Sequence, residues 1–275
     1  MKLKIYSLLI TLLVLGASCD KKRDRVFEES PTERLNVSVD QAYSILKSQS
    51  NGWLVKYYPS STLEFGGYTL FAKFSSSTEV NLQGDYTTNN ATSMYTVYPG
   101  AGPILTFDTY NPVIHYFALP GAYFSPQIGA VDSGHKGDFE FLVVKATPDS
   151  VILQGRKTMN KIVMLPISTT EAPTIVANYK AAVAKFHPRG AYKVEVGGES
   201  LTATFSTAAT KRAFTVTGST TIYSYRYTDK GLDFYKEYDI KGVKFKELTF
   251  VEPTGSYTRG YFENAEKTLK LVPGS

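Results

Sequence analysis

The sequence has one cysteine, Cys19, one tryptophan and three histidines among its 275 residues. A single cysteine cannot form an internal disulfide, so the fold must be stabilised by burial of its apolar side chains. The histidines, His115, His135 and His187, are too dispersed to form a local zinc motif, and no His-Glu-x-x-His segment occurs. We therefore expect no metal site.

Motifs of catalysis are also scarce. No Gly-x-Ser-x-Gly nucleophile elbow occurs, and Gly100 and Gly102 are not followed by the third glycine and helix of a dinucleotide site. We expect no cofactor, assign no catalytic residue and expect a protein that is not an enzyme. Two carboxylates from distant strands would leave no sequence motif, so a hydrolase acting on a glycan or peptide is the alternative.

One apolar run, Ile5–Leu15, follows Lys2 and Lys4 and precedes Gly16-Ala17-Ser18-Cys19. As a helix it would span about 16 Å, roughly half of a bilayer core, so we do not expect a permanent transmembrane helix. A basic start, a short apolar run and small residues are typical of a secretory signal. We predict a lipoprotein signal peptide over residues 1–18, with Cys19 as the lipid acceptor. The alternative is an ordinary signal peptide with an incidental cysteine.

The net charge of +5 is concentrated at the N-terminus, where residues 1–25 hold six of the 30 basic residues and two of the 25 acidic residues. The rest of the chain is nearly neutral, so we expect no nucleic-acid partner. Residues 19–29 are highly charged and predict a flexible tether. The proportion of hydrophobic residues, 43%, is sufficient for a packed core beyond it.

A helix followed by strands is predicted after the tether. Ser30 and Glu33 form a capping-box pattern around Pro31, and apolar residues at helical spacing predict a helix over Pro31–Ser50. After Gly52 the apolar period becomes 2, which is typical of strands. The predicted strands are Trp53–Tyr58, Tyr68–Ser75, Glu79–Gly84, Ser93–Tyr98, Ile104–Asp108, Asp138–Ala146, Ser150–Lys157 and Lys161–Ile167.

The same order is predicted again in the second half, with a helix over Ala172–Phe186. Its predicted strands are Tyr192–Val196, Leu201–Ser206, Ala213–Thr217, Thr221–Thr228, Leu232–Glu237, Val243–Val251, Ser256–Phe262 and Thr268–Val272. We predict a mainly β (α+β) fold of two tandem helix-plus-antiparallel-meander units, residues 30–168 and 169–275. Each would be a strongly curved or barrel-like sheet of about eight strands, because closure removes exposed edges. The alternative is one larger continuous sheet with both helices on the same side.

The ends of the two halves can be aligned, Phe139–Pro166 with Phe245–Pro273. Pro148 then matches Pro253 and Gly155 matches Gly260, while Pro166 and Pro273 close the two segments. These matched positions of proline and glycine predict an internal duplication. The alternative is that β-meanders share turn residues through their chemistry alone.

One connection, Tyr110–Asp138, is far longer than the roughly 4–6 residues usual in compact domains, and the second half has no equivalent. Such an insertion is a reasonable place for a ligand site. Its aromatic and hydrogen-bonding groups give the predicted ligand-binding residues Asp108, Tyr110, His115, Tyr116, Tyr123, Phe124 and Asp138. The structural alternatives are that Phe117 fills the core, that His115 is a hydrogen-bonded structural residue, and that Asp108 and Asp138 cap backbone amides.

Several segments together resemble a known family: Glu29–Arg34, Asn51-Gly52-Trp53, Leu105–Asn111, His115-Tyr116-Phe117 and Gly137–Phe141. They are similar to the Bacteroidota lipoproteins of the domain of unknown function 4302, which have no established activity. The resemblance implies a lipid anchor in the outer membrane, at its periplasmic face or the cell surface. It also implies a gene located near those of TonB-dependent transporters and their lipoprotein partners, so we expect such a transporter and its lipoprotein partner as partners.

We accordingly expect an outer-membrane lipoprotein that is a non-enzymatic accessory protein in nutrient uptake and binds a ligand or a partner protein. Besides the hydrolase, a third interpretation is a structural or adhesion lipoprotein without a small-molecule site.

Overall fold

The computed structural model describes residues 29–124, 127, 129, 131–208 and 210–274. The chain divides into two units, Met1–Arg34 and Leu35–Ser275. The predicted signal peptide, Cys19 and all but the last residue of the predicted tether lie outside the described residues. Among the residues that are described, no helix has the length and apolar character needed to cross a membrane.

The first helix, α2 (Pro31–Ser48), begins at the predicted capping box. The Glu33 amide donates to Ser30 Oγ at 3.2 Å, and the Ser30 amide donates to Glu33 Oε2 at 2.7 Å. Both exchanged bonds satisfy amides that a helix start leaves unpaired. Farther along α2, Leu46 packs in the core, and its carbonyl accepts a hydrogen bond of 2.8 Å from the indole of Trp53.

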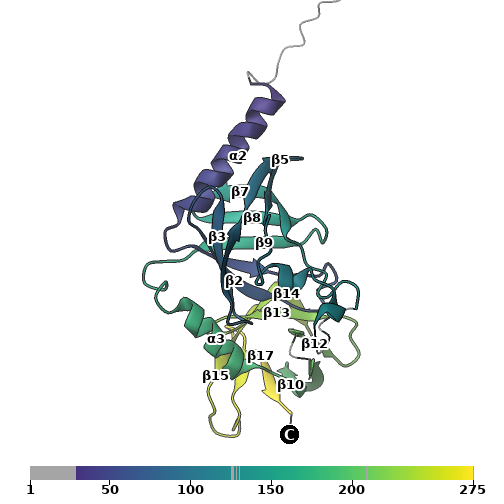
Figure 1. The fold of residues 1–275 in the computed structure, drawn as a ribbon. Coiled ribbons are helices and arrows are strands. Elements are labelled where there is room, and N and C mark those ends of the chain that lie inside the picture. Colours follow the sequence, from purple (N-terminus) through teal and green to yellow (C-terminus); the bar gives the residue numbers. More distant parts are fainter. Residues whose placement is uncertain (1–28, 125–126, 128, 130, 209, 275) are drawn as a thin grey trace, which may run out of the picture. The chain divides into compact units, whose positions relative to one another are not determined.

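Nine antiparallel strands form the first sheet, in the order β4-β3-β2-β1-β9-β8-β7-β6-β5 (Figure 1). They are β1 (Trp53–Tyr57), β2 (Tyr68–Phe74), β3 (Glu79–Gly84), β4 (Asn90–Met94), β5 (Thr96–Pro99), β6 (Pro103–Thr106), β7 (Glu140–Thr147), β8 (Ser150–Gly155) and β9 (Lys161–Pro166). Because β1 pairs with both β2 and β9, the first and last strands of this meander are neighbours. The sheet is open only between β4 and β5.

One predicted strand, Ser93–Tyr98, is divided in the structure. Tyr95 separates β4 from β5, and its side chain is buried in the core. The strand bends there, since β4 pairs with β3 whereas β5 pairs with β6. This bend accounts for nine observed strands where the sequence predicts eight.

The second half forms a closed eight-stranded barrel in which each strand pairs with its sequence neighbours and β10 pairs with β17. Its strands are β10 (Gly190–Val196), β11 (Glu199–Phe205), β12 (Ala213–Val216), β13 (Tyr223–Tyr227), β14 (Gly231–Ile240), β15 (Val243–Val251), β16 (Tyr261–Glu263) and β17 (Leu269–Pro273). Its core is rich in aromatic side chains, among them Phe205, Phe214, Tyr225, Tyr227 and Phe234. These rings occupy the interior that a larger barrel could offer to a ligand.

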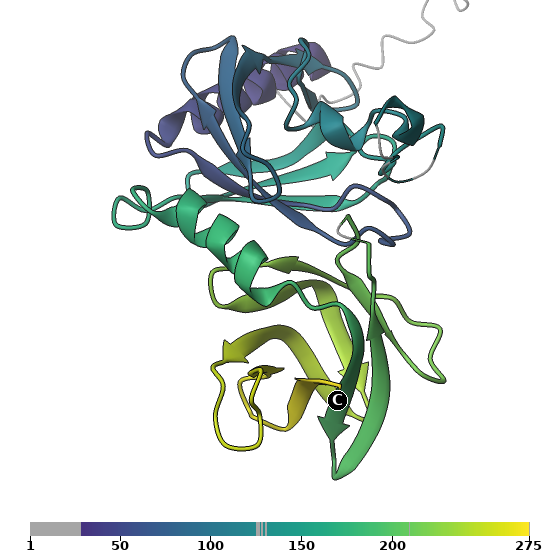
Figure 2. The same ribbon diagram turned by 60° about the horizontal axis from the view of Figure 1, so that its bottom comes forward.

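Helix α3 (Ile175–Phe186) contacts both sheets (Figure 2). Ile175 and Tyr179 pack against Leu54 and Phe71 of the first sheet, whereas Phe186 belongs to the barrel core. The helix begins three residues later than predicted. A separate turn precedes it, in which Ser168 and Glu171 exchange hydrogen bonds.

The structure confirms the predicted mainly β fold with two strongly curved antiparallel sheets, and the alternative of one continuous sheet is wrong. The aligned segments Phe139–Pro166 and Phe245–Pro273 cover the last three strands of their respective sheets. Pro166 pairs with Trp53 on β1, and Pro273 pairs with Tyr192 on β10. The match of the two glycines is wrong, because Gly155 ends β8 whereas Gly260 precedes β16. Internal duplication stays a prediction.

Candidate functional site

The long connection Tyr110–Asp138 lies between β6 and β7, whereas Lys241 and Gly242 alone separate the corresponding barrel strands β14 and β15. It contains two 3₁₀ turns, η1 (His115–Phe117) and η2 (Gly121–Tyr123). Phe117 is completely buried, with its ring centroid 4.8 Å from that of Tyr57 and 4.7 Å from that of Tyr68. The start of the connection therefore completes the core of the first sheet.

The carboxylate of Asp138 accepts hydrogen bonds from the turn after β8. Its Oδ1 accepts a hydrogen bond of 2.8 Å from the Lys157 amide. Its Oδ2 accepts bonds of 2.9 and 2.6 Å from the amide and hydroxyl of Thr158. A Cβ at Gly155 would lie 2.3 Å from this Oδ2, so the turn requires glycine there. Asp138 is buried and both of its oxygens are occupied.

Three further predicted ligand-binding residues, Tyr116, Tyr123 and Phe124, contact one another or other aromatic rings. Tyr116 stacks on Tyr86 with centroids 4.7 Å apart, and Phe124 lies 5.4 Å from Tyr116. Tyr123 contacts Phe124 and is 74% exposed.

His115, Tyr110 and Asp108 lie at the beginning of the connection. His115 stacks on Phe139 and its Nδ1 accepts the Asn111 amide, while the exposed Tyr110 lies beside it. Asp108 accepts a hydrogen bond from the Thr96 hydroxyl. The structure thus pairs Tyr110 with His115 and groups Tyr116, Tyr123 and Phe124, whereas Asp108 and Asp138 contact other segments. A ligand site in this connection stays a prediction.

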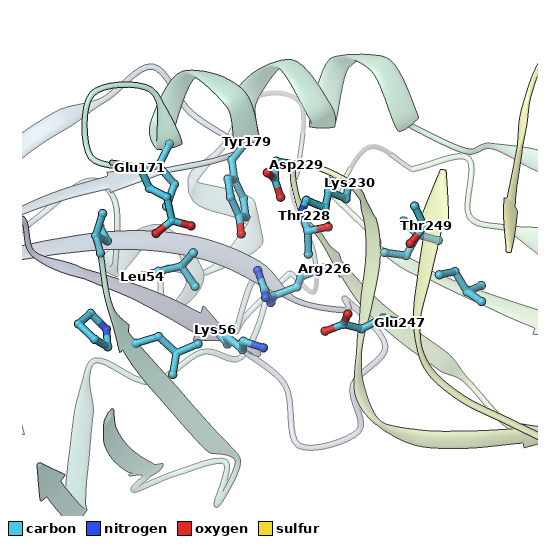
Figure 3. Close-up of a pocket in the computed structure, with 16 residues that line it drawn as sticks. Leu54, Lys56, Glu171, Tyr179, Arg226, Thr228, Asp229, Lys230, Glu247 and Thr249 are labelled. Carbon is cyan, nitrogen blue, oxygen red and sulfur yellow. Dashed lines mark hydrogen bonds between the residues drawn. The ribbon is translucent and has the colours of Figure 1, made fainter. Parts of the chain in front are cut away.

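A second location has the features of a binding site. Two cavities of about 300 and 390 Å³ adjoin at Lys56 and Leu165, and we call them together the junction groove. Figure 3 shows the smaller of the two. The groove follows the outer face of β1 and β9, and its opposite wall comes from β13, β14 and β15, with α3 covering one end. Such a volume suits a small ligand.

A buried carboxylate lies at the centre of the junction groove. Asp233, on β14, is 1% exposed, and its Oδ2 accepts hydrogen bonds of 2.9 Å from both Lys56 Nζ and Arg226 Nε. Arg226 Nη2 lies 2.7 Å from the same oxygen, and Lys246 Nζ lies 3.1 Å from Oδ1. Figure 3 shows Tyr179 and Lys56 approaching the Arg226 guanidinium from α3 and β1. Three cations therefore surround one anion.

This surplus of positive charge changes the pKa values of Asp233 and Lys246. Burial would raise the pKa of Asp233, but Arg226, Lys56 and Lys246 outweigh it and lower that pKa. Burial lowers the pKa of Lys246, and repulsion from Lys56 and Arg226 lowers it further, against the attraction of Asp233. Asp233 therefore does not fully compensate the three cations that surround it.

The two walls of the junction groove are fixed by a second buried ion pair. Arg212 Nη1 lies 2.7 Å from Asp85 Oδ2, and both side chains are nearly inaccessible to solvent. The guanidinium also lies over the Tyr68 ring, 4.1 Å from its centroid. A Cβ at Gly66 would lie 2.0 Å from the Arg212 carbonyl oxygen, so the backbones of the first sheet and the barrel meet at a glycine. This close approach favours a preformed groove.

Comparison with protein families shows that the model of Domain of unknown function (DUF4302) matches residues 23–252. The chain belongs to this family. No curated protein and no solved structure matches this DUF4302 member. Over the described residues, no group of three or more His, Cys, Asp and Glu side chains is placed to hold a metal ion.

Sequence reasoning missed the junction groove in this DUF4302 protein, although two signals were present. Lys56 interrupts an apolar strand, and Arg226 is a charged residue within β13, between Tyr225 and Tyr227. A charged residue within a buried strand indicates a partner or a ligand. The partner could not be predicted, because Lys56 and Asp233 are 177 residues apart and meet only through packing of the two sheets.

The central carboxylate can be tested with Asp233→Asn. We expect a loss of about 3–5 kcal/mol in the free energy of unfolding at pH 7, because Arg226 and Lys56 would be left without a buried counter-charge. Urea unfolding measures this loss. Glu237→Gln, at an exposed residue of the same strand, is the control and should change stability by less than about 0.5 kcal/mol.

The difference between wild type and Asp233→Asn should also depend on pH. The pKa of Asp233 is lowered in the folded state, so its stabilising contribution is complete above the ordinary aspartate pKa of about 4. That contribution is lost as pH falls through the lower, folded-state value. The two proteins should therefore converge in stability in acid, and a variant as stable as wild type at pH 7 would contradict the assignment.

Proposed function

We propose that this protein is an outer-membrane lipoprotein, anchored through Cys19, that binds a ligand in the junction groove as a non-enzymatic accessory of nutrient uptake. The arrangement of Lys56, Arg226 and Lys246 around Asp233 is the observation that carries this proposal. The partners that we propose are a TonB-dependent transporter and its lipoprotein partner. The protein would lie at the periplasmic face of the outer membrane or at the cell surface.

Packing of the two cores favours the junction groove over the sheet interiors as a ligand site. The cavity inside the first sheet is about 20 Å³ and is lined by apolar side chains such as Leu70 and Met164. This is little more than the space of one water molecule. The barrel core is occupied by its own aromatic side chains. A small ligand therefore has more room on the outer faces, where the two sheets meet.

Rigidity of the groove is a second argument for binding. Buried hydrogen bonds connect its walls, including Arg226 Nη1 to Thr69 Oγ1 at 2.9 Å and the Gly67 amide to the Tyr225 carbonyl at 2.9 Å. A preformed site loses less conformational entropy when a ligand enters.

A hydrolase is the second candidate function, because Glu171, Asp229 and Glu247 line the 300 Å³ cavity (Figure 3). All three carboxylates are exposed. A general acid for glycoside hydrolysis normally has its pKa raised by an apolar environment, so their exposure favours binding over catalysis. Release of shortened glycan or peptide products by the purified protein would favour the hydrolase.

The lipid anchor is tested by Cys19→Ala. Cys19 is the only cysteine and follows a short apolar signal, so the variant should lose fatty-acid labelling and leave the membrane fraction. Metabolic labelling with a radioactive fatty acid and cell fractionation measure both effects. Unchanged labelling in the variant would contradict the proposed anchor.

The junction groove is tested by Leu165→Trp, because Leu165 lines both cavities and a larger side chain would narrow them. The wild-type protein should bind a member of a panel of neutral and acidic oligosaccharides and peptides, and Leu165→Trp should reduce that binding at least tenfold by titration calorimetry. Val144→Trp, at an exposed apolar residue of β7, is the matched control and should bind as wild type.

A third variant, Tyr116→Ala, distinguishes the groove from the long connection. Ligand binding that is lost in Tyr116→Ala with retained folding, but is unaffected by Leu165→Trp, would place the site in the Tyr110–Asp138 connection. That result would overturn the proposed groove.

A further inference from the structure

Three of the nine residues that line the larger cavity of the junction groove are lysines. Lys56, Lys161 and Lys246 line it, and Asp233 is its single acidic residue. Tyr58 and Tyr235 form an edge-to-face pair beside them, with centroids 4.8 Å apart. We call this cavity of about 390 Å³ the lysine end.

The charges of the lysine end do not cancel. Asp233 is already bonded to Lys56 and to the buried Arg226, and it also contacts Lys246. Lys161 has no ion-pair partner among the residues described. Glu247, which follows Lys246 in the sequence, lines the other cavity. A net positive charge therefore remains in a concave site, where field lines are focused.

Two of these cations, Lys161 and Lys246, are accessible to a ligand from solvent. The Lys246 side chain is 45% exposed and Lys161 is exposed, whereas Arg226 is almost completely buried. The buried Arg226 and the partly buried Lys56 hold Asp233 Oδ2, so Asp233 compensates Lys246 only in part and does not contact Lys161. Leu165, Val163 and Tyr235 add half-buried apolar surface next to them. An anionic group attached to a small partly apolar ligand matches this combination.

We infer that the lysine end binds the oxyanion, a carboxylate, sulfate or phosphate, of a small ligand, through Lys161 and Lys246. This inference rests on the proposed function and names the ligand class of the same groove. Lysine ammonium groups act as point charges that do not require the planar geometry of a carboxylate, so the three oxyanions share this chemistry.

The experiment uses four probes with the purified mature chain: galacturonate, galactose as its neutral counterpart, inorganic sulfate and inorganic phosphate. Binding is measured by titration calorimetry and by the shift in melting temperature at constant ionic strength. We expect at least one anionic probe to bind and galactose to bind at least tenfold more weakly than galacturonate. Which anion binds most tightly distinguishes a carboxylate from a sulfate or phosphate ligand. Affinity should fall as salt is raised.

The lysines are tested singly and together as Lys161→Gln and Lys246→Gln. Each change should weaken anion binding by about tenfold, the typical effect of losing a hydrogen bond to a charged group. The fold should survive, because Lys56 and Arg226 still compensate Asp233. Lys244→Gln is the matched control, since Lys244 lies on the same strand, pairs with Glu237 and does not line the cavity.

Two results would overturn the inference. One is that no anionic probe binds, and the other is that the double variant binds the anion as tightly as wild type. If a neutral ligand binds and only Leu165→Trp prevents it, the anion inference fails while the proposed groove stands. If Leu165→Trp affects no ligand, the proposed function of the groove fails independently of the lysines.

Discussion

The structure depends on pairing two buried arginines with two buried carboxylates where the first sheet meets the barrel. Arg212 pairs with Asp85 across the two sheets, and Arg226 pairs with Asp233 while donating to Thr69 of the first sheet. Breaking a buried ion pair costs several kcal/mol, so packing of the two sheets in another way would leave uncompensated charges. The relative position of the sheets is thus determined by a few specific polar contacts as well as by apolar area.

The proposed binding site is a consequence of this junction. Because Asp233 must compensate the buried Arg226, it can only partly compensate Lys56 and Lys246. Positive charge is therefore left over on the accessible side of the groove. The interiors of both sheets are occupied by their own side chains, and the cavities at the junction are larger than the one inside the first sheet.

Local patterns predicted much of the fold and little of the candidate site. The Ser30–Glu33 capping box and the change to period 2 after Gly52 identified the elements, because both depend on neighbouring residues. The length of the Tyr110–Asp138 connection was also visible, but its burial of Phe117 was only one of two interpretations. The junction groove required knowing which outer face of one sheet packs against the other. Alternation along a strand shows which side chains share a face and leaves open what covers that face.

Equilibrium unfolding in urea, followed in each sheet separately, tests this account most directly. Trp53 is the only tryptophan and lies in the core of the first sheet, so its fluorescence reports on that sheet, while amide hydrogen exchange in β13 and β14 reports on the barrel. If the buried ion pairs join the two sheets as described, both reporters should show one transition with the same midpoint. Two separate transitions would show that the sheets unfold independently, and they would contradict the claim that the junction holds a preformed groove.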